Sequence, residues 1–240
     1  MSRIVHIALK CDNKEDLDEA TSFYEDVFGI YTTKEKHARG HLSRHMTDGN
    51  IDLALMLYDS EDEKEAKLAG PGIQIHHIGV EVADRPSMIK KIEDNGGSIF
   101  SDRAEGALKY FAADGTLGEI VAAGRYPTKE RSKLSRISNV SYNVKDLAKA
   151  VAFYKNVFGF QEVADAATSS RRVLTDGETT LTLNEGGDRP AIVAWGLEVE
   201  DPAAVAQQVE QRGAELGTGG TGVRNFRGPD GNIAELFQAA

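Results

Sequence analysis

The chain repeats itself in two alternating patterns. The segment FYEDVFG at residues 23–29 recurs as FYKNVFG at residues 153–159, an offset of 130 residues. A second segment, VEVADRPSMIKKIEDNGG at residues 80–97, matches LEVEDPAAVAQQVEQRGA at residues 197–214, an offset of 117 residues. Four Asp-Gly pairs punctuate these segments, at residues 48–49, 114–115, 176–177 and 230–231. Self-similarity at a fixed spacing predicts repeated supersecondary units. We therefore expect two kinds of unit that alternate, each of them occurring twice.

The order of elements within one unit follows from the spacing of its apolar residues. Apolar residues dominate residues 4–9, which predicts a short strand, and they recur at helical spacing from Leu17 to Phe28. Gly29 then ends the helix. Residues 41–47 and 51–58 are extended in character and flank the Asp48-Gly49-Asn50 turn. Each unit is thus predicted to contain a strand, a helix and about three further strands in about 60 residues.

The length of the chain allows one large domain or two small ones. The 240 residues are more than the roughly 150 of an average domain. Residues 124–136, GRYPTKERSKLSR, carry five basic residues, one acidic residue and a proline without a periodic apolar face, which predicts a linker. We therefore expect one domain at residues 1–125, with units at 1–60 and 72–125, and a second domain at residues 136–240.

Composition and charge exclude several classes of function. The 38 acidic and 28 basic residues give a net charge of −10, which disfavours nucleic acid and anionic membrane surfaces as partners. The single cysteine, Cys11, cannot form an internal disulfide or a thiolate zinc site, so any metal must be bound by nitrogen and oxygen. No apolar run approaches the roughly 18 residues of a membrane span, and the first residues lack the features of a signal peptide. We expect a cytoplasmic protein.

These repeats resemble a known family. The paired units, the FYxxVFG helix end, the HHIGVEV strand start at residue 76 and the DGxxxE strand end at residue 114 are similar to the vicinal oxygen chelate superfamily. That superfamily includes glyoxalases, epimerases, extradiol dioxygenases and drug-resistance proteins, and the resemblance covers essentially the whole chain. It implies an α+β fold in which four βαβββ modules pair into two cupped, barrel-like mixed sheets with the helices outside. It also implies a divalent metal in the concavity, bound by residues of first and last strands.

The repeat locates the positions that correspond to those ligands. The residues seven before the four Asn or Asp residues that follow each first strand are His6, His77, Asn139 and Ala194. The residues four after the turn glycines are Leu53, Glu119, Leu181 and Glu235. Only the first half of the chain offers a full set of ligands, so we expect a metal at His6, His77 and Glu119. The second half is degenerate, and we expect Asn139 and Glu235 to form hydrogen bonds there.

The ligand set favours one activity among three. Two histidines and one glutamate leave positions open on iron(II) or manganese(II), although zinc(II) and nickel(II) are also accommodated. Extradiol dioxygenases of the superfamily use this set, so the resemblance implies ring cleavage of a small aromatic or vicinal-oxygen substrate. One alternative is a lyase or isomerase that acts through an enediolate. Leu53 argues against this alternative, because those enzymes generally take a metal ligand from all four equivalent strands and an aliphatic side chain cannot coordinate a metal. The other alternative is a drug-binding protein without catalysis.

Two residues are candidates for proton transfer. They are His45, before the Asp48 turn, and Tyr110, before Asp114. The dioxygenases place a tyrosine ten residues before the ligand glutamate, whereas here Tyr110 lies nine residues before Glu119 and Lys109 lies ten before. A shift of one residue on a strand reverses the face, so outward packing is the alternative role of Tyr110.

The remaining expectations concern the surroundings of the site. His76 adjoins His77 and points to the opposite face of its strand, which predicts a surface residue. The aromatic residues of both FYxxVFG segments are predicted to lie in the core. We expect a small-molecule substrate as the binding partner. A monomer and a homodimer are both compatible with four units in one chain.

Overall fold

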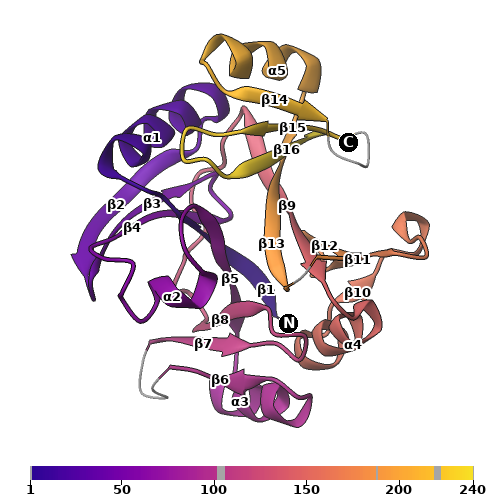
Figure 1. Ribbon diagram of the computed structural model, residues 1–240. Coiled ribbons are helices and arrows are strands. Elements are labelled where there is room, and N and C mark those ends of the chain that lie inside the picture. Colours follow the sequence, from indigo (N-terminus) through magenta and orange to yellow (C-terminus); the bar gives the residue numbers. More distant parts are fainter. Residues whose placement is uncertain (1, 102–105, 188, 219–222, 240) are drawn as a thin grey trace. The chain divides into compact units, whose positions relative to one another are not determined.

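The structure is a computed structural model that describes residues 2–101, 106–187, 189–218 and 223–239 (Figure 1). It has an α+β fold, and the predicted repeat of strand, helix and three strands is confirmed in all four modules. Module 1 contains β1 (Arg3–Lys10), α1 (Lys14–Phe28), β2 (Tyr31–Ala38), β3 (His41–Thr47) and β4 (Asp52–Tyr58), followed by the short α2 (Ala66–Ala69). Module 2 contains β5 (Gln74–Val82), α3 (Arg85–Asp94), β6 (Ser98–Ile99), β7 (Ala107–Phe111) and β8 (Leu117–Ala122).

The second half of the chain repeats this order. Module 3 contains β9 (Ser135–Val144), α4 (Leu147–Phe158), β10 (Gln161–Glu162), the 3₁₀ helix η1 (Ala164–Ala166), β11 (Arg171–Thr175) and β12 (Thr180–Glu185). Module 4 contains β13 (Ala191–Val199), α5 (Pro202–Gln211), β14 (Glu215–Thr218), β15 (Arg224–Arg227) and β16 (Ile233–Gln238).

The strands of a module pair in the same way from module to module. In modules 2, 3 and 4 the three later strands form an antiparallel meander, and the last of them pairs in parallel with the first strand of the module. The meander of module 1 is β2–β3–β4. First and last strands of one module are therefore neighbours, which brings residues of both onto one sheet face.

Each long helix begins at a side-chain cap. Asn13, Asp84, Asp146 and Asp201 occupy the N-cap positions, and each side chain accepts a hydrogen bond from a backbone N–H of the first turn. Two helices end at a glycine in the left-handed region, Gly29 with φ of 64° and Gly159 with φ of 77°. The capping residues are the same ones that define the repeat in the sequence.

The contacts divide the chain into two compact units. The first unit comprises residues 1–6, 77–127 and 139–193, and therefore most of modules 2 and 3. The second unit comprises residues 7–76, 128–138 and 194–240, and therefore most of modules 1 and 4. The domains predicted from the sequence, residues 1–125 and 136–240, instead group modules that follow one another along the chain. That division stays a prediction.

The aromatic residues of the two FYxxVFG segments are buried, as predicted. In the first unit Phe153 and Tyr154 pack edge to face with ring centroids 5.5 Å apart, and both are at most 2% exposed. In the second unit Phe23 and Tyr24 pack in the same way at 5.4 Å. Such aromatic pairs stabilise a fold beyond the effect of burying their apolar area. Each unit thus carries its own aromatic core beneath one helix.

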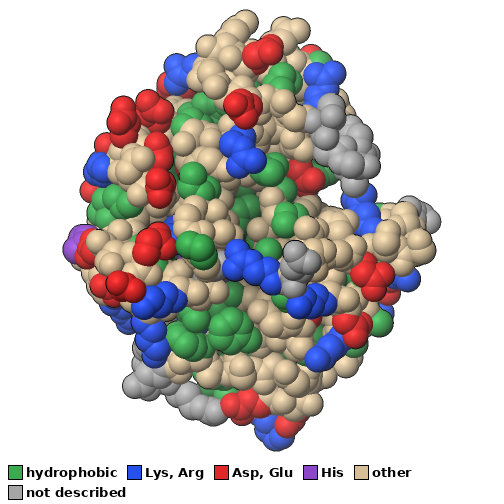
Figure 2. Space-filling view, viewed as in Figure 1, with side chains coloured by type: hydrophobic (Ala, Val, Ile, Leu, Met, Phe, Trp, Pro, Cys, Tyr) green, Lys and Arg blue, Asp and Glu red, His purple; other side chains and the backbone are tan. Residues whose placement is uncertain are grey.

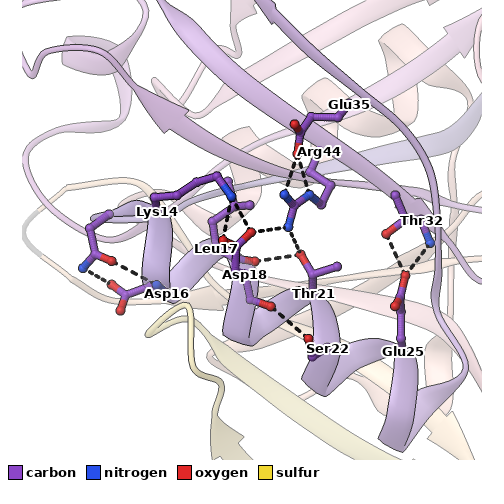
Figure 3. Close-up of polar contacts among 11 residues, drawn as sticks. Lys14, Asp16, Leu17, Asp18, Thr21, Ser22, Glu25, Thr32, Glu35 and Arg44 are labelled. Atoms are coloured by element: carbon purple, nitrogen blue, oxygen red, sulfur yellow. Dashed lines mark hydrogen bonds and ion pairs between the residues drawn. The ribbon is translucent and has the colours of Figure 1, made fainter.

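A polar network secures α1 on its sheet in the second unit. Arg44 of β3 donates to Asp18 and Thr21 of α1, at 2.7 and 2.9 Å, and to Glu35 of β2 (Figure 3). Lys14 pairs with Asp18 along the helix. The Arg44 side chain is only 14% exposed and contacts three residues, so this network is more strongly restrained than an isolated surface ion pair.

The visible surface carries charges of both signs. On the face drawn in Figure 2, Lys and Arg side chains are interspersed with Asp and Glu side chains. Within the described parts of the chain, no helix is long and apolar enough to cross a membrane.

Candidate metal centre

The three predicted ligands come together in the first unit. His6 of β1, His77 of β5 and Glu119 of β8 each offer a ligand atom, and these atoms all lie within 4.8 Å of one another. The side chains are 1–3% exposed. His77 Nε2 and Glu119 Oε2 are 3.5 Å apart. The structure therefore gathers two imidazoles and one carboxylate from three strands that are far apart in the sequence.

Strand register explains how His77 and Glu119 meet. In the parallel pair of β5 and β8, Gly79 is opposite Glu119. His77 lies two residues before Gly79, and side chains two residues apart on a strand point to the same face. The imidazole and the carboxylate consequently project from neighbouring strands toward one point.

His6 is held between a glycine and an aromatic ring. A Cβ atom at Gly79 would stand 2.8 Å from His6 Cβ, so the absence of a side chain there admits His6. On its other side, the His6 ring stacks on Tyr126 with ring centroids 4.6 Å apart and an interplanar angle of 5°. Tyr126 is buried with Val5 and Val121. Tyr126 lies in the segment that is predicted to be a linker, and no local pattern distinguishes it there.

A lysine completes the group of buried polar side chains. Lys109 of β7 is opposite Glu119 of β8 in the antiparallel register. Its Nζ lies 3.0 Å from His77 Nε2 and contacts Glu119 Oε2. Lys109 is 7% exposed. The count of ten residues before Glu119 therefore identifies the residue of β7 that faces the candidate centre.

These charges control the protonation of Glu119. Burial by itself raises the pKa of this carboxyl, but the Lys109 ammonium and the neighbouring His77 and His6 outweigh burial and hold its pKa well below its usual range. Glu119 is therefore a carboxylate at neutral pH. That is the form that coordinates a metal.

The donor set fits a divalent metal. Two histidines and a carboxylate on one face are a common arrangement for iron(II) and related ions, and they leave other coordination positions open. Glu119 Oε1 is buried and has no hydrogen-bond partner among the described residues. A buried carboxylate oxygen that lacks a donor is unfavourable unless a cation or water satisfies it. The cluster can hold a metal ion.

Tyr110 faces away from this group. In the β7–β8 register it is opposite Gly118, on the other side of the strands from Lys109 and Glu119. Its ring packs against Phe158 and stacks on Phe153, with centroids 5.8 and 6.1 Å away. Burial, with a smaller effect of the charge on Asp114, raises the pKa of Tyr110 far above its ordinary value. The structure thus packs Tyr110 among aromatic rings, and its catalytic role stays a prediction.

His45 lies in the second unit. It is on β3, and its Nδ1 is 2.8 Å from Asp52 Oδ2. A carboxylate at this distance fixes the orientation of an imidazole, as required of a histidine that transfers protons. Its role in proton transfer stays a prediction.

The corresponding first-strand position of module 3, Asn139, forms hydrogen bonds instead. Asn139 Oδ1 accepts from the hydroxyls of Thr180 and Thr182, both at 2.9 Å, and its Nδ2 donates to Ser141. The prediction of a hydrogen-bonding remnant at Asn139 is confirmed. Glu235 of β16 is half-buried in the second unit.

The prediction that His76 is a surface residue is wrong. His76 is 2% exposed, and its Nε2 lies 3.1 Å from the Tyr58 hydroxyl and 2.9 Å from the carbonyl oxygen of Glu65. The alternation of faces along β5 is as predicted, but both faces of the strand are covered. A strand buried on both faces has no solvent side for either histidine.

A protein-family model matches most of the chain. The family model described as the Glyoxalase/Bleomycin resistance protein/Dioxygenase superfamily matches residues 3–114 and 136–236. No curated protein matches the sequence. The matched residues take in His6 and His77 as well as most of the second half of the chain.

Solved structures share the fold over nearly the whole chain. A variant of 4-hydroxymandelate synthase from Streptomyces coelicolor superposes with a TM-score of 0.73 at 15% identity, covering 98% of this chain and 92% of that one. The 2,3-dioxygenase LapB from a Pseudomonas species gives 0.69 at 14% identity, with 99% and 92% covered. A 2,2',3-trihydroxybiphenyl 1,2-dioxygenase from Sphingomonas wittichii gives 0.67 at 16% identity, with 99% and 90% covered. At these identities the likeness establishes the fold.

Proposed function

Because the chain belongs to the Glyoxalase/Bleomycin resistance protein/Dioxygenase superfamily, we propose that it is a metal-dependent enzyme that cleaves the ring of a small aromatic substrate. The substrate carries two vicinal oxygens, and iron(II) or manganese(II) is the favoured metal. One observation carries the proposal, namely the convergence of His6, His77 and Glu119 in one unit. The dioxygenases among the structural neighbours support it at the level of the fold.

The ligand set restricts which chemistry the centre serves. His6, His77 and Glu119 would hold the metal, which supplies Lewis-acid activation of the two substrate oxygens and the redox chemistry that reaction with dioxygen needs. The fourth position counted from the repeat holds Leu53, a fully buried aliphatic residue in the second unit. A three-residue ligand set leaves more positions for a chelating substrate than a four-residue set does.

The surrounding residues prepare the ligands for this task. Burial keeps bulk water from His77 and Glu119, which strengthens every electrostatic interaction between them. The Tyr126 ring sets the plane of the His6 imidazole, and Gly79 lets that imidazole approach β5. The carboxylate of Glu119 is already ionised at neutral pH. The chain thus orients its ligands before a metal binds, as a preorganised centre requires.

The proposal is tested by loading the protein with iron(II) or manganese(II) under anaerobic conditions and measuring metal per chain. Oxygen uptake is then followed with a panel of catechols and hydroquinones. We expect about one metal per chain, and a product whose mass equals substrate plus one dioxygen, because ring cleavage of this kind incorporates both oxygen atoms.

Matched variants assign the result to this centre. His77→Ala and Glu119→Ala are expected to abolish both metal binding and oxygen uptake, since each removes a ligand. Glu235→Ala changes the corresponding glutamate of module 4 and is expected to leave both unchanged. Loss of metal with Glu235→Ala alone would move the centre to the other half of the chain. Binding of zinc or nickel without oxygen uptake would favour a lyase or isomerase, and a chain that binds no metal would favour a drug-binding protein.

A further inference from the structure

The ammonium group of Lys109 occupies the place at which two of the three ligands would meet a metal. Its Nζ is 3.0 Å from His77 Nε2 and contacts Glu119 Oε2, while His77 and Glu119 are themselves 3.5 Å apart at these two atoms. The Lys109 ammonium thus contacts both His77 Nε2 and Glu119 Oε2. A cation that is held by these two atoms is an alternative to a metal ion at the same ligands.

The position of Lys109 is a consequence of the fold. Lys109 and Glu119 are directly opposite each other in the β7–β8 pair, so their side chains leave the sheet on the same face. The next residue, Tyr110, leaves on the other face and is packed among aromatic rings. Lysines are almost never buried as deeply as Lys109, which is 7% exposed, unless they are paired. Glu119 is the partner that permits this burial.

The contacts of Lys109 and those of a metal are mutually exclusive. An ammonium group has donors only, so its contact with His77 Nε2 uses the nitrogen lone pair of the imidazole. The same lone pair coordinates a metal. The charges also conflict, because Lys109 and Glu119 together are neutral, whereas a divalent ion would add two positive charges beside the ammonium.

We propose that Lys109 is the resident cation of the metal-free centre and that a divalent metal binds only when Lys109 leaves His77 Nε2 and Glu119 Oε2. This inference rests on the proposed function, since it takes His6, His77 and Glu119 as the ligands. Lys109 is thereby a positioning residue: it keeps the imidazole and the carboxylate close together without a metal, and it weakens metal binding.

The test measures manganese(II) affinity by isothermal titration of the whole protein and of the variant Lys109→Met. Methionine is close in length and has no charge. Removal of a competing cation at contact distance is expected to tighten manganese binding by about tenfold or more. Lys109→Arg keeps the positive charge and is expected to bind manganese no more tightly than the unaltered chain.

A second substitution and a control guard against general loss of structure. Lys109→Gln removes the charge but keeps a hydrogen-bond donor for Glu119, so it serves if Lys109→Met does not fold, and it too is expected to tighten binding. Lys10→Met is the control, because Lys10 is also buried, at 1% exposed, and pairs with Glu61 in the second unit. It is expected to lower stability and to leave manganese affinity unchanged.

Thermal unfolding supplies an independent readout. Without metal, Lys109→Met is expected to melt at a lower temperature than the unaltered chain, because Glu119 loses its counter-ion. With saturating manganese(II) this deficit is expected to shrink, since stabilisation by a bound ligand grows with the logarithm of its affinity.

The outcomes separate this inference from the proposed function. Equal manganese affinity in the unaltered chain, Lys109→Met and Lys109→Gln would overturn the inference while leaving the metal centre intact. Tighter binding in the uncharged variants without oxygen uptake would support the inference and contradict the proposed activity. If neither the unaltered chain nor any of these variants binds manganese, both the inference and the proposed function fail.

Discussion

The side chain of His6 lies against the backbone of Gly79, where a Cβ atom would stand only 2.8 Å from His6 Cβ. Gly79 is also the residue of β5 that is opposite Glu119 of β8. One glycine therefore sets the spacing between a ligand on β1 and a ligand on β8. Any side chain at this position would have to displace His6 or the strand.

Gly79→Ala is expected to weaken metal binding as well as the fold. Overpacking of this kind costs about 1–3 kcal/mol, and displacement of one ligand is expected to reduce manganese affinity by about tenfold or more. Isothermal titration measures the affinity, and denaturant unfolding measures the stability. Ile78→Val is the control on the same strand: it loses about 0.5–1.5 kcal/mol and should keep its metal affinity. A Gly79→Ala variant with unchanged affinity would contradict this account of His6.

Tyr126 is expected to support metal binding through the plane of the His6 ring. The two rings are stacked at 4.6 Å. Tyr126→Leu keeps an apolar side chain but loses the stacked ring, which is worth about 0.5–1.5 kcal/mol, so manganese affinity should fall by about two- to tenfold. Tyr126→Phe keeps the ring and should lose less. Equal losses in both variants would show that the hydroxyl, and not the stacking, is what matters.

Tyr110→Phe distinguishes a packing role from a catalytic one. The Tyr110 hydroxyl is buried without a hydrogen-bond partner among the described residues, so its removal is expected to be neutral or to stabilise the protein by about 1 kcal/mol. Tyr110→Ala removes the ring between Phe153 and Phe158 and is expected to cost about 3–5 kcal/mol. If Tyr110→Phe abolished turnover at unchanged stability and metal content, the catalytic role predicted from the sequence would be right.

A pH dependence is expected from the buried pair of Tyr24 and Asp230 in the second unit. The Tyr24 hydroxyl donates to Asp230 Oδ1 at 2.7 Å. Burial raises the pKa of Asp230, although the hydrogen bonds from Tyr24 and Asn232 lower it in part. A carboxyl with a raised pKa in the folded state favours folding when it is protonated. Its contribution to stability is therefore present below the unfolded pKa of about 4 and is lost as the pH rises through the folded pKa.

Tyr24→Phe removes one of the donors that offset this loss. It is expected to lower the free energy of unfolding by about 1–3 kcal/mol where the pH lies above the folded pKa of Asp230 and the carboxylate is charged. The difference from the unaltered chain should shrink as the pH falls through the raised folded pKa of Asp230. Urea unfolding of both proteins across this range measures it. A difference that stays constant with pH would show that the effect of the Tyr24 hydroxyl does not depend on the charge of Asp230.

The repeated modules could be predicted from residue spacing, and the resemblance to a known family pointed to the three candidate ligand positions. The four modules and the corresponding positions of His6, His77 and Glu119 follow from counting residues from helix caps and turn glycines. Those counts are reliable because the rise of a strand and the period of a helix are properties of the local backbone. The aromatic residues of the FYxxVFG segments are predicted to be buried for the same reason, and they are.

The partners of the ligands depend on contacts between distant segments. Lys109 faces Glu119, and Tyr110 does not, because β7 and β8 pair in one register and not in the neighbouring one. Tyr126 reaches His6 from a segment that looks like a linker, and His76 is buried because both faces of β5 are covered. A register between two strands, or the layer that covers a strand, arises from the sum of packing and hydrogen bonds across the unit. The spacing of residues along one segment determines neither the register nor the covering layer. The surroundings of the candidate centre are therefore decided only in the folded chain.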